Sequence, residues 1–327
     1  MGHTLLEVRD LKKHFKVKSG ILHAVDGVSF TVEEGKTIGI VGESGCGKST
    51  LGRVILHLHE RTDGQIFFNG EDISDVSHSK LQELRSEMQM IFQDPFSSIN
   101  PRKTVSSIIG EPMKIYHTCS SKAEYREKVL DLMNTVGLES RVYNDFPHEL
   151  DGGKRQRIGI ARALAIEPKF IICDEPVSAL DVSIQAQILN LMMDLQEARG
   201  LTYMFITHDL SVVKHISNDI CVMYLGTAVE KSPTNELFQM PLHPYTKALL
   251  SAIPIPSLHH RRKRIILKGE ITSPVNLKKA CRFAPRCVYA TDRCHCEEPE
   301  LREVRPGHFV QCHYVEEINC GAASQDR

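Results

Sequence analysis

The sequence predicts an α/β fold built on a mainly parallel sheet. Three short stretches, residues 37–41, 170–173 and 203–206, are almost entirely apolar. Such runs are typical of strands that are buried on both faces of a parallel sheet. A helix expected over residues 183–199 and ended by Gly200 separates the last two runs. Strand, helix and strand therefore alternate, as in α/β proteins.

The remaining elements follow from hydrophobic periodicity. Short strands are expected over residues 5–8 and 24–30, on either side of a polar and basic stretch. A helix should begin at Ser49 and run towards His57. Two further helices are expected over residues 78–92 and 122–137, where apolar side chains recur at three- and four-residue spacing. No internal repeat is visible, so the sequence predicts a single copy of this unit.

Composition restricts the partners of the chain. The 327 residues contain 40 Lys and Arg against 41 Asp and Glu, which gives no general electrostatic reason to bind nucleic acid or acidic lipid. The basic run 259–264 is a local candidate, although a solvated linker is the simpler interpretation. No apolar stretch approaches the roughly 20 residues that cross a bilayer, and no secretory signal is visible. Any membrane attachment is therefore expected through a protein partner.

Prolines and basic residues interrupt the pattern around residues 251–275. We therefore expect a main domain over residues 1–250 and an extension over residues 251–327. Six of the 10 cysteines crowd this extension: Cys281, Cys287, Cys294, Cys296, Cys312 and Cys320. In a chain without a signal peptide, such crowding favours metal binding over disulfides.

A glycine-rich loop follows the first buried strand. Residues 42–49 read Gly-Glu-Ser-Gly-Cys-Gly-Lys-Ser and match G-x-x-x-x-G-K-[ST]. The glycines let the loop wrap tightly, so that backbone N–H groups and the next helix N-terminus face phosphates. Lys48 should bind the β- and γ-phosphates of ATP, and the Ser49 hydroxyl should bind Mg²⁺. The predicted nucleotide contacts are Gly42, Glu43, Ser44, Gly45, Cys46, Gly47, Lys48, Ser49 and Thr50.

Acidic residues stand at the end of the second buried strand. Asp174 and Glu175 follow residues 170–173 directly, at the carboxyl edge where open α/β sheets bind ligands. Asp174 is expected in the Mg²⁺ shell, and Glu175 is expected to polarise the water that attacks the γ-phosphate. His208 follows the next strand and should lie on the same edge. Solvated acids and a structural histidine are the alternatives. The glycine-rich loop upstream disfavours the first, and the position of His208 on this edge disfavours the second.

These residues, with Gln93 before a proline turn, resemble the nucleotide-binding subunit of ABC transporters. The resemblance covers residues 5 to about 250. It implies a P-loop ABC cassette with a RecA-like core, an antiparallel β subdomain and a helical subdomain at about 95–160. It also implies that Gln93 contacts Mg²⁺ and the attacking water, and that Asp181 communicates across a dimer. Phe15 stands where the family has an aromatic residue that stacks on adenine, although a core phenylalanine is an alternative.

The signature motif of the family departs from its usual form. The family has L-S-G-G-Q, and the chain has Leu150, Asp151, Gly152, Gly153 and Lys154 in these positions. The resemblance implies that the signature contacts the ATP held by the opposite subunit. Aspartate caps a helix as well as serine does, but it brings a negative charge towards phosphate, which Lys154 is placed to offset. The alternatives are a weakened site on the partner or a variant compensated by Lys154.

Longer stretches resemble a narrower group, the second ATPase subunit of oligopeptide and dipeptide importers. They are residues 96–102, 173–183 and 243–250. The resemblance implies an ATP-hydrolysing subunit that energises peptide import from the cytoplasmic face of the membrane. It also implies a second, homologous ATPase as heterodimer partner, two membrane permeases and an extracytoplasmic substrate-binding protein, with no nucleic acid. Nickel importers belong to the same group, so nickel is an alternative cargo.

The tail cysteines extend the resemblance. Cys281, Cys287, Cys294 and Cys312 follow C-x5-C-x6-C with a distant fourth residue, as in these peptide-importer ATPases, some of which carry an iron–sulfur cluster. Four thiolates suit a [4Fe–4S] cluster or Zn²⁺, and unligated thiols are the third possibility.

Two other functions fit less well. A soluble ABC protein acting on ribosomes or DNA would usually carry tandem cassettes or coiled-coil insertions, and the chain has neither. A regulatory cassette without turnover is opposed by the presence of Glu175 and His208.

Overall fold

The computed structural model describes residues 2–94, 98–253, 264–267, 269 and 274–320. Most of the basic run predicted at 259–264 lies outside these residues. The chain divides into two units, each formed by several segments. Unit 1 contains Met1–His3, Glu33–Lys36 and Asp75–Ile206, and unit 2 contains Thr4–Val32, Thr37–Ser74 and Thr207–Arg327.

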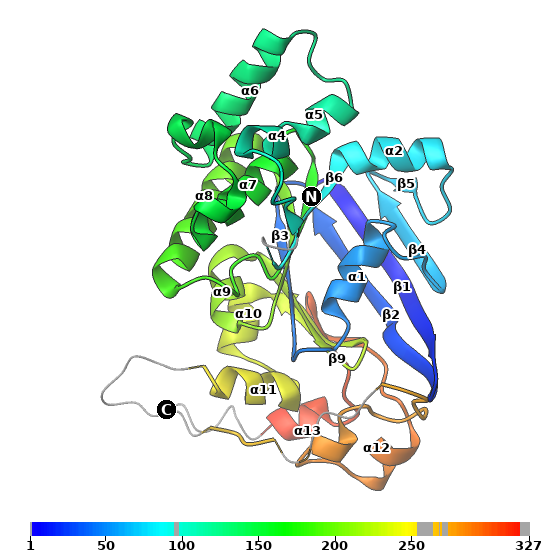
Figure 1. The fold of residues 1–327 in the computed structure, drawn as a ribbon. Helices are drawn as coiled ribbons and strands as arrows, with labels where there is room; N and C mark the ends of the chain where they lie inside the picture. Colours follow the sequence, from blue (N-terminus) through cyan, green and yellow to red (C-terminus); the bar gives the residue numbers. More distant parts are fainter. Residues whose placement is uncertain (1, 95–97, 254–263, 268, 270–273, 321–327) are drawn as a thin grey trace, which may run out of the picture. The chain divides into compact units, whose positions relative to one another are not determined.

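An antiparallel sheet forms the N-terminal part of unit 2 (Figure 1, blue strands). Its strand order is β2-β1-β4-β5. The bounds are Thr4–Val17 for β1, Gly20–Glu33 for β2, Asp63–Phe68 for β4 and Glu71–Asp72 for β5. The strands predicted over 5–8 and 24–30 thus lie within longer strands. Leu6 and Val8 of β1 are paired with Phe68 and Ile66 of β4, and all four side chains are buried, so one face of this sheet forms a core.

A second sheet of unit 2 begins with the strand before the glycine-rich loop. Within this unit the strand order is β11-β12-β10-β9-β3. The strands are β3 (Thr37–Val41), β9 (Asp219–Tyr224), β10 (Thr227–Pro233), β11 (Arg302–Arg305) and β12 (His308–Val310). β3 is parallel to β9, whereas β10, β12 and β11 add antiparallel strands. The C-terminal extension therefore continues the sheet that carries the glycine-rich loop.

Short helices complete unit 2. They are α1 (Lys48–Ile55), α9 (Leu210–Ile216), α10 (Thr234–Gln239), α11 (Pro244–Ser251), the 3₁₀ turn η3 (Ala284–Arg286), α12 (Asp292–Cys296) and α13 (Val315–Asn319). Val310 and Val315 of the extension form a small buried cluster with Leu242, and Val304 and Cys312 pack against this cluster.

Unit 1 contains three parallel strands and most of the longer helices. Its strands are β6 (Met88–Ile91), β7 (Phe170–Asp174) and β8 (Thr202–Thr207, of which Thr207 belongs to unit 2). β7 and β8 are buried at every position, as their apolar runs predicted. The helices are α2 (His78–Glu87), α4 (Val105–Ile109), α5 (Glu111–Ile115), α6 (Lys122–Thr135), α7 (Gly152–Leu164) and α8 (Val182–Arg199), with 3₁₀ turns η1 (Ser140–Asn144) and η2 (Pro147–Glu149).

The single helix expected over residues 78–92 is wrong in its second part. Helix α2 ends at Glu87, and residues 88–91 form β6, which pairs in parallel with β7. Met88, Met90 and Ile91 are buried there. Three of the four side chains in this run are apolar, which suits either a helix or a buried strand. The parallel pairing with β7 shows that it is a strand.

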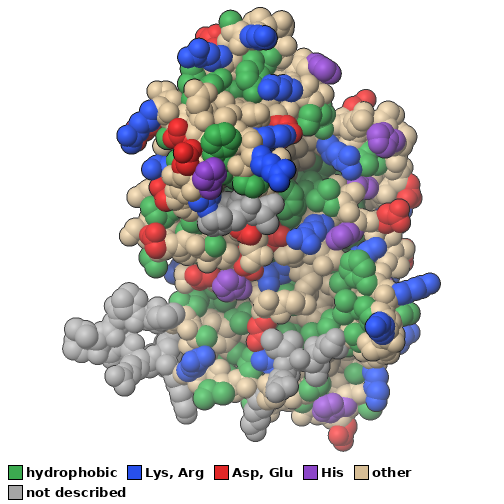
Figure 2. Space-filling model, viewed as in Figure 1, with side chains coloured by type: hydrophobic (Ala, Val, Ile, Leu, Met, Phe, Trp, Pro, Cys, Tyr) green, Lys and Arg blue, Asp and Glu red, His purple; other side chains and the backbone are tan. Residues whose placement is uncertain are grey.

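None of the helices among the described residues is long and apolar enough to cross a membrane. Acidic and basic side chains are interspersed over the face shown in Figure 2, in keeping with the near-zero net charge of the chain.

Candidate nucleotide site

The glycine-rich loop lies between β3 and α1 in unit 2. Gly42 and Gly47 have φ angles of 155° and 104°, in the region that favours glycine. A Cβ on Gly47 would lie 1.9 Å from the Ala24 carbonyl oxygen, and one on Gly42 would lie 2.3 Å from that of Met223. The loop is therefore confined by neighbouring backbone, and only glycine fits at these two positions.

Lys48 is the first residue of α1 and is buried within the loop. Its ammonium group donates hydrogen bonds to the carbonyl oxygens of Gly42 (2.8 Å) and Glu43 (2.9 Å). Gly47 is the N-cap residue and has no side chain with which to cap the helix. A buried cation and a helix N-terminus thus lie together inside one loop, an arrangement that suits polyphosphate.

Two residues far away in the sequence hold the loop at Glu43. The Tyr245 hydroxyl of α11 accepts a hydrogen bond from the Glu43 N–H (2.9 Å). Arg286 of η3 pairs with the Glu43 carboxylate through both terminal nitrogens, with N···O distances of 2.6 and 3.1 Å. The Arg286 side chain is 8% exposed and that of Glu43 is 23% exposed. The hydrogen bonds to Glu43 raise the pKa of Arg286 still further, so its guanidinium stays ionised.

Arg286 was not predicted as a site residue. It lies between two cysteines that were expected to bind metal, and it is separated from Glu43 by 243 positions. Tyr245 belongs to a stretch that resembled the importer family, but no role followed from that resemblance. Local sequence contained no signal for either contact.

Unit 2 also contains Phe15 and His208. Phe15 lies on β1 and is half-buried, outside the buried core. Its ring makes an edge contact with His59 at 5.8 Å, and the Lys13 ammonium lies 4.8 Å from its centre. This environment differs from that of a core phenylalanine, and adenine stacking stays a prediction. His208 directly follows β8 and is exposed.

The acidic pair lies in unit 1 at the end of β7. Asp174 is buried as the last residue of the strand, and Glu175 follows with a left-handed φ of 47°. The Glu175 N–H donates to the carbonyl oxygen of Ile206 on β8 (2.9 Å), which holds this backbone conformation. A left-handed conformation costs a residue with a side chain on the order of 1–3 kcal/mol, and such strain is concentrated at functional sites.

Gln93 is joined to Glu175. Its amide nitrogen donates to Glu175 Oε2 at 2.9 Å, across 82 positions of the sequence. The structure thus brings together two of the three residues predicted to be catalytic. This hydrogen bond fixes the direction of the Glu175 carboxylate. A carboxylate that acts on a water must be oriented in this way.

The variant signature begins helix α7. Asp151 is the N-cap, and its Oδ1 accepts a hydrogen bond from the Lys154 N–H at 2.8 Å. The Lys154 ammonium lies 3.1 Å from Asp151 Oδ2. The hydrogen bond from the Lys154 backbone, together with the Lys154 ammonium, lowers the pKa of the exposed Asp151 carboxylate. Asp151 is therefore an ionised cap whose charge is paired with Lys154.

Asp181 occupies the same position on the next helix. It is the N-cap of α8, and its Oδ1 accepts from the Ile184 N–H at 3.0 Å. Both Asp181 and Val182, which is 80% exposed, lie at the surface of unit 1.

The four tail cysteines are neighbours in the extension. The Cys281 N–H donates to the Cys294 carbonyl oxygen at 2.9 Å. Burial raises the pKa of Cys281 to about 12 and that of Cys312 to about 11, and the nearby thiols, Cys294 among them, add to both shifts. Across the described residues, however, no three cysteine sulfurs lie within 4.8 Å of one another. Tetrahedral zinc would hold four sulfurs about 3.8 Å apart, so the arrangement does not match a zinc site.

The fold and the glycine-rich loop define a nucleotide-binding protein of the P-loop class. Among solved structures, the ATP-binding cassette MJ0796 in a dimeric, post-hydrolysis state with ADP and Pi aligns with a TM-score of 0.65 and 29% identity, over 70% of this chain and 99% of that one. The cbiO1 protein from Clostridium perfringens aligns with a TM-score of 0.65 and 26% identity, over 73% of this chain and 92% of that one.

Sequence comparisons identify the family to which the chain belongs within the P-loop class. Residues 25–178 match the ABC transporter family, and residues 229–294 match the oligopeptide/dipeptide transporter C-terminal region. The chain is 53% identical to the oligopeptide transport ATP-binding protein AppF of Bacillus subtilis, over 95% of this chain and 97% of the relative. It is 48% identical to the dipeptide transport ATP-binding protein DppF of Haemophilus influenzae, over 95% and 97%. The chain therefore belongs to the family of ATP-binding subunits of oligopeptide and dipeptide ABC transporters.

Proposed function

We propose that this chain hydrolyses ATP to drive the import of oligopeptides or dipeptides through membrane permeases. The observation that carries the proposal is the loop of residues 42–49, which holds a buried lysine and a helix N-terminus within a cradle that only glycine can form. Relatives named as oligopeptide and dipeptide transport ATP-binding proteins support peptides, rather than nickel, as the cargo.

In this proposal the loop residues predicted from the sequence bind the triphosphate. Lys48 exchanges its hydrogen bonds to loop carbonyls for the β- and γ-phosphate oxygens. Ser49, Asp174 and Gln93 are the expected Mg²⁺ ligands; the ion would neutralise charge that develops on the phosphates. The half-buried ring of Phe15 is the expected adenine contact.

Glu175 is the proposed general base. Its carboxylate is oriented by Gln93, so that it accepts a proton from water as the water attacks the γ-phosphate. His208, exposed at the end of β8, is proposed to contact the γ-phosphate. Because Gln93 touches Glu175, a movement of the Gln93 segment would misdirect the base. This supports a link between hydrolysis and the permeases.

We further propose that the chain pairs with a second, homologous ATPase. Asp151, Gly152, Gly153 and Lys154 would then face the ATP of that partner, and Asp181 would lie at the dimer interface. The ion pair between Asp151 and Lys154 supports the compensated form of the signature over a weakened one. Two permeases and an extracytoplasmic binding protein complete the proposed complex.

The tail cysteines Cys281, Cys287, Cys294 and Cys312 are proposed ligands of a [4Fe–4S] cluster. Their proximity supports a shared group, and their spacing disfavours zinc. Anaerobic purification of the full chain should give about four irons and four sulfides per chain, with a visible absorption that is lost in Cys287→Ser. A colourless, iron-free chain would refute the cluster and leave the ATPase proposal intact.

Co-purification from membranes of the native host tests the transport function. Recovery of a second ATPase, two permeases and a peptide-binding protein, identified by mass spectrometry, would support it. Recovery of ribosomal or DNA-repair proteins without a permease would refute transport. Uptake of labelled peptide by vesicles of the purified complex, compared with uptake of Ni²⁺, then identifies the cargo.

A further inference from the structure

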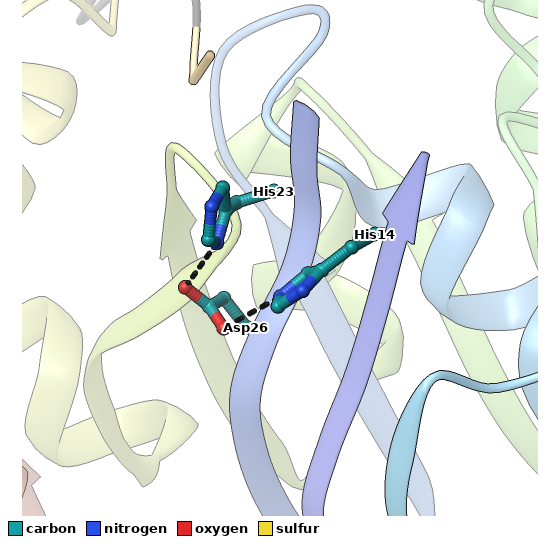
Figure 3. A group of neighbouring side chains, drawn as sticks. All are labelled: His14, His23 and Asp26. Carbon is teal, nitrogen blue, oxygen red and sulfur yellow. Dashed lines mark hydrogen bonds and ion pairs between the residues drawn. The ribbon is translucent and has the colours of Figure 1, made fainter. Parts of the chain in front are cut away.

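Two histidines and an aspartate meet on the β1–β2 hairpin of unit 2 (Figure 3). His14 lies on β1, and His23 and Asp26 lie on β2. The carboxylate stands between the two imidazoles, with Oδ1 2.8 Å from His14 Nε2 and Oδ2 3.0 Å from His23 Nδ1. One donor atom from each residue lies within 4.8 Å of the other two, the only such group of histidine, cysteine or acidic side chains across the described part of the chain.

We propose that His14, His23 and Asp26 bind a divalent transition-metal ion of the zinc type. Two imidazoles and one carboxylate are a common ligand set for zinc, with water in the remaining position. At zinc–ligand distances of 2.0–2.2 Å, tetrahedral donors stand about 3.4 Å apart. The distances of 2.8 and 3.0 Å run to different carboxylate oxygens, so whichever oxygen binds the ion would move about 0.5 Å away from one imidazole. The other donor–donor distances lie within 4.8 Å.

The backbone of each proposed ligand is held by a different neighbour. The His14 N–H donates to Thr62 Oγ1 (2.9 Å), the His23 N–H to the carbonyl oxygen of Pro274 (2.9 Å), and the Asp26 N–H to that of Gly226 (2.8 Å). A site whose ligands are fixed before the ion arrives loses less entropy on binding. The three side chains are 22%, 23% and 16% exposed, so an ion from solvent can reach them.

Arg282 forms an ion pair with Asp26, one of the three proposed ligands. It donates to Asp26 Oδ2 (2.5 Å) and to the carbonyl oxygen of Leu225 (2.6 Å), so that it orients the carboxylate. The same guanidinium lies 3.4 Å from the Glu298 carboxylate. Two carboxylates face one guanidinium, so the charges of Asp26, Glu298 and Arg282 sum to −1, and this charge favours a dication.

Binding also requires a change of tautomer. In the hydrogen-bonded arrangement His14 Nε2 and His23 Nδ1 carry the protons that they donate to Asp26. The ion would take the place of those two protons, and each proton would move to the other nitrogen of its own ring. No net proton is released when both imidazoles are neutral.

The test uses Co²⁺ as the probe on the purified full-length chain. Cobalt bound by nitrogen and oxygen shows weak visible bands, whereas thiolate ligation adds intense near-ultraviolet charge transfer, so the tail cysteines are distinguished from this site. His14→Gln and His23→Asn keep a hydrogen-bond donor towards Asp26 but replace the imidazole ligand. His78→Ala, an exposed histidine at the start of α2, is the matched control.

Wild type and His78→Ala should each bind one Co²⁺ with a nitrogen–oxygen spectrum, and zinc should displace it. His14→Gln and His23→Asn should each fail to bind this Co²⁺ ion, but in the absence of metal they should fold as wild type does. At a free zinc concentration of 100 times Kd, the ratio of folded to unfolded wild type should rise about 100-fold. Equal cobalt binding by the amide variants, or a spectrum of thiolate type alone, would overturn the proposal and leave a purely hydrogen-bonded triad. This inference does not depend on the transport function.

Discussion

Loss of the ion pair between Arg286 and Glu43 should weaken both folding and ATP binding. Removal of one partner from a fully buried pair costs about 3–5 kcal/mol, and an exposed pair contributes at most about 1 kcal/mol. Arg286 is buried, but about a quarter of the Glu43 side chain reaches solvent, so Arg286→Gln should lower the free energy of unfolding by about 2 kcal/mol.

Part of this loss should appear in nucleotide binding, because Glu43 belongs to the loop. If all 2 kcal/mol came from disorder of the loop, ATP affinity would fall about 30-fold. Tyr245 and Lys48 retain their bonds to the Glu43 backbone, so we expect a fall of about 5- to 10-fold. Urea unfolding and titration with a fluorescent ATP analogue measure the two effects on one preparation.

A double-mutant cycle separates the pair from its surroundings. Glu43→Gln combined with Arg286→Gln allows the two amides to bond to each other, so the double variant should lose about 1 kcal/mol less than the sum of the single variants. Arg293→Gln is the matched control, since its pair with Glu297 lies in the same extension with both side chains more than half exposed. Additive losses, or reduced stability with unchanged ATP affinity, would refute the positioning of the loop by Arg286.

Three further predictions concern single residues. Glu175→Gln should bind ATP as wild type does but hydrolyse it at least about 100-fold more slowly in a phosphate-release assay; near-normal turnover would exclude Glu175 as the base. Asp151→Ser should leave ATPase and transport of the complex unchanged, whereas Lys154→Gln should lower both several-fold; equal effects would refute compensation of Asp151 by Lys154. His243 is buried, which lowers its pKa to about 4. As the pH falls, His243 should therefore take up a proton at a higher pH in the unfolded chain than in the folded chain. The free energy of unfolding should then decline between about pH 6.5 and pH 4, by up to about 3 kcal/mol. A flat pH series in urea would contradict this.

The parts of the site that could be predicted from the sequence are all encoded by short, continuous motifs. The loop around Lys48 and the acidic pair after β7 each depend on residue types at fixed spacing beside an apolar strand, and such patterns are visible in one sequence. The buried strands were predicted for the same reason. β6 was missed because its four residues continue the apolar spacing of α2, and only the pairing with β7 distinguishes a strand there.

The contacts of the extension could not be predicted, because they depend on tertiary structure. Residues 281–287 carry two of the proposed cluster cysteines, and Arg282 and Arg286 lie next to them in sequence. Arg282 binds Asp26 on β2 and Arg286 binds Glu43 in the glycine-rich loop, at separations of 256 and 243 positions. If this segment unfolded, two partly buried carboxylates would lose their cations at once, and one of them lies in the loop that we propose binds ATP. The fold of the extension and the order of the glycine-rich loop are therefore linked within unit 2.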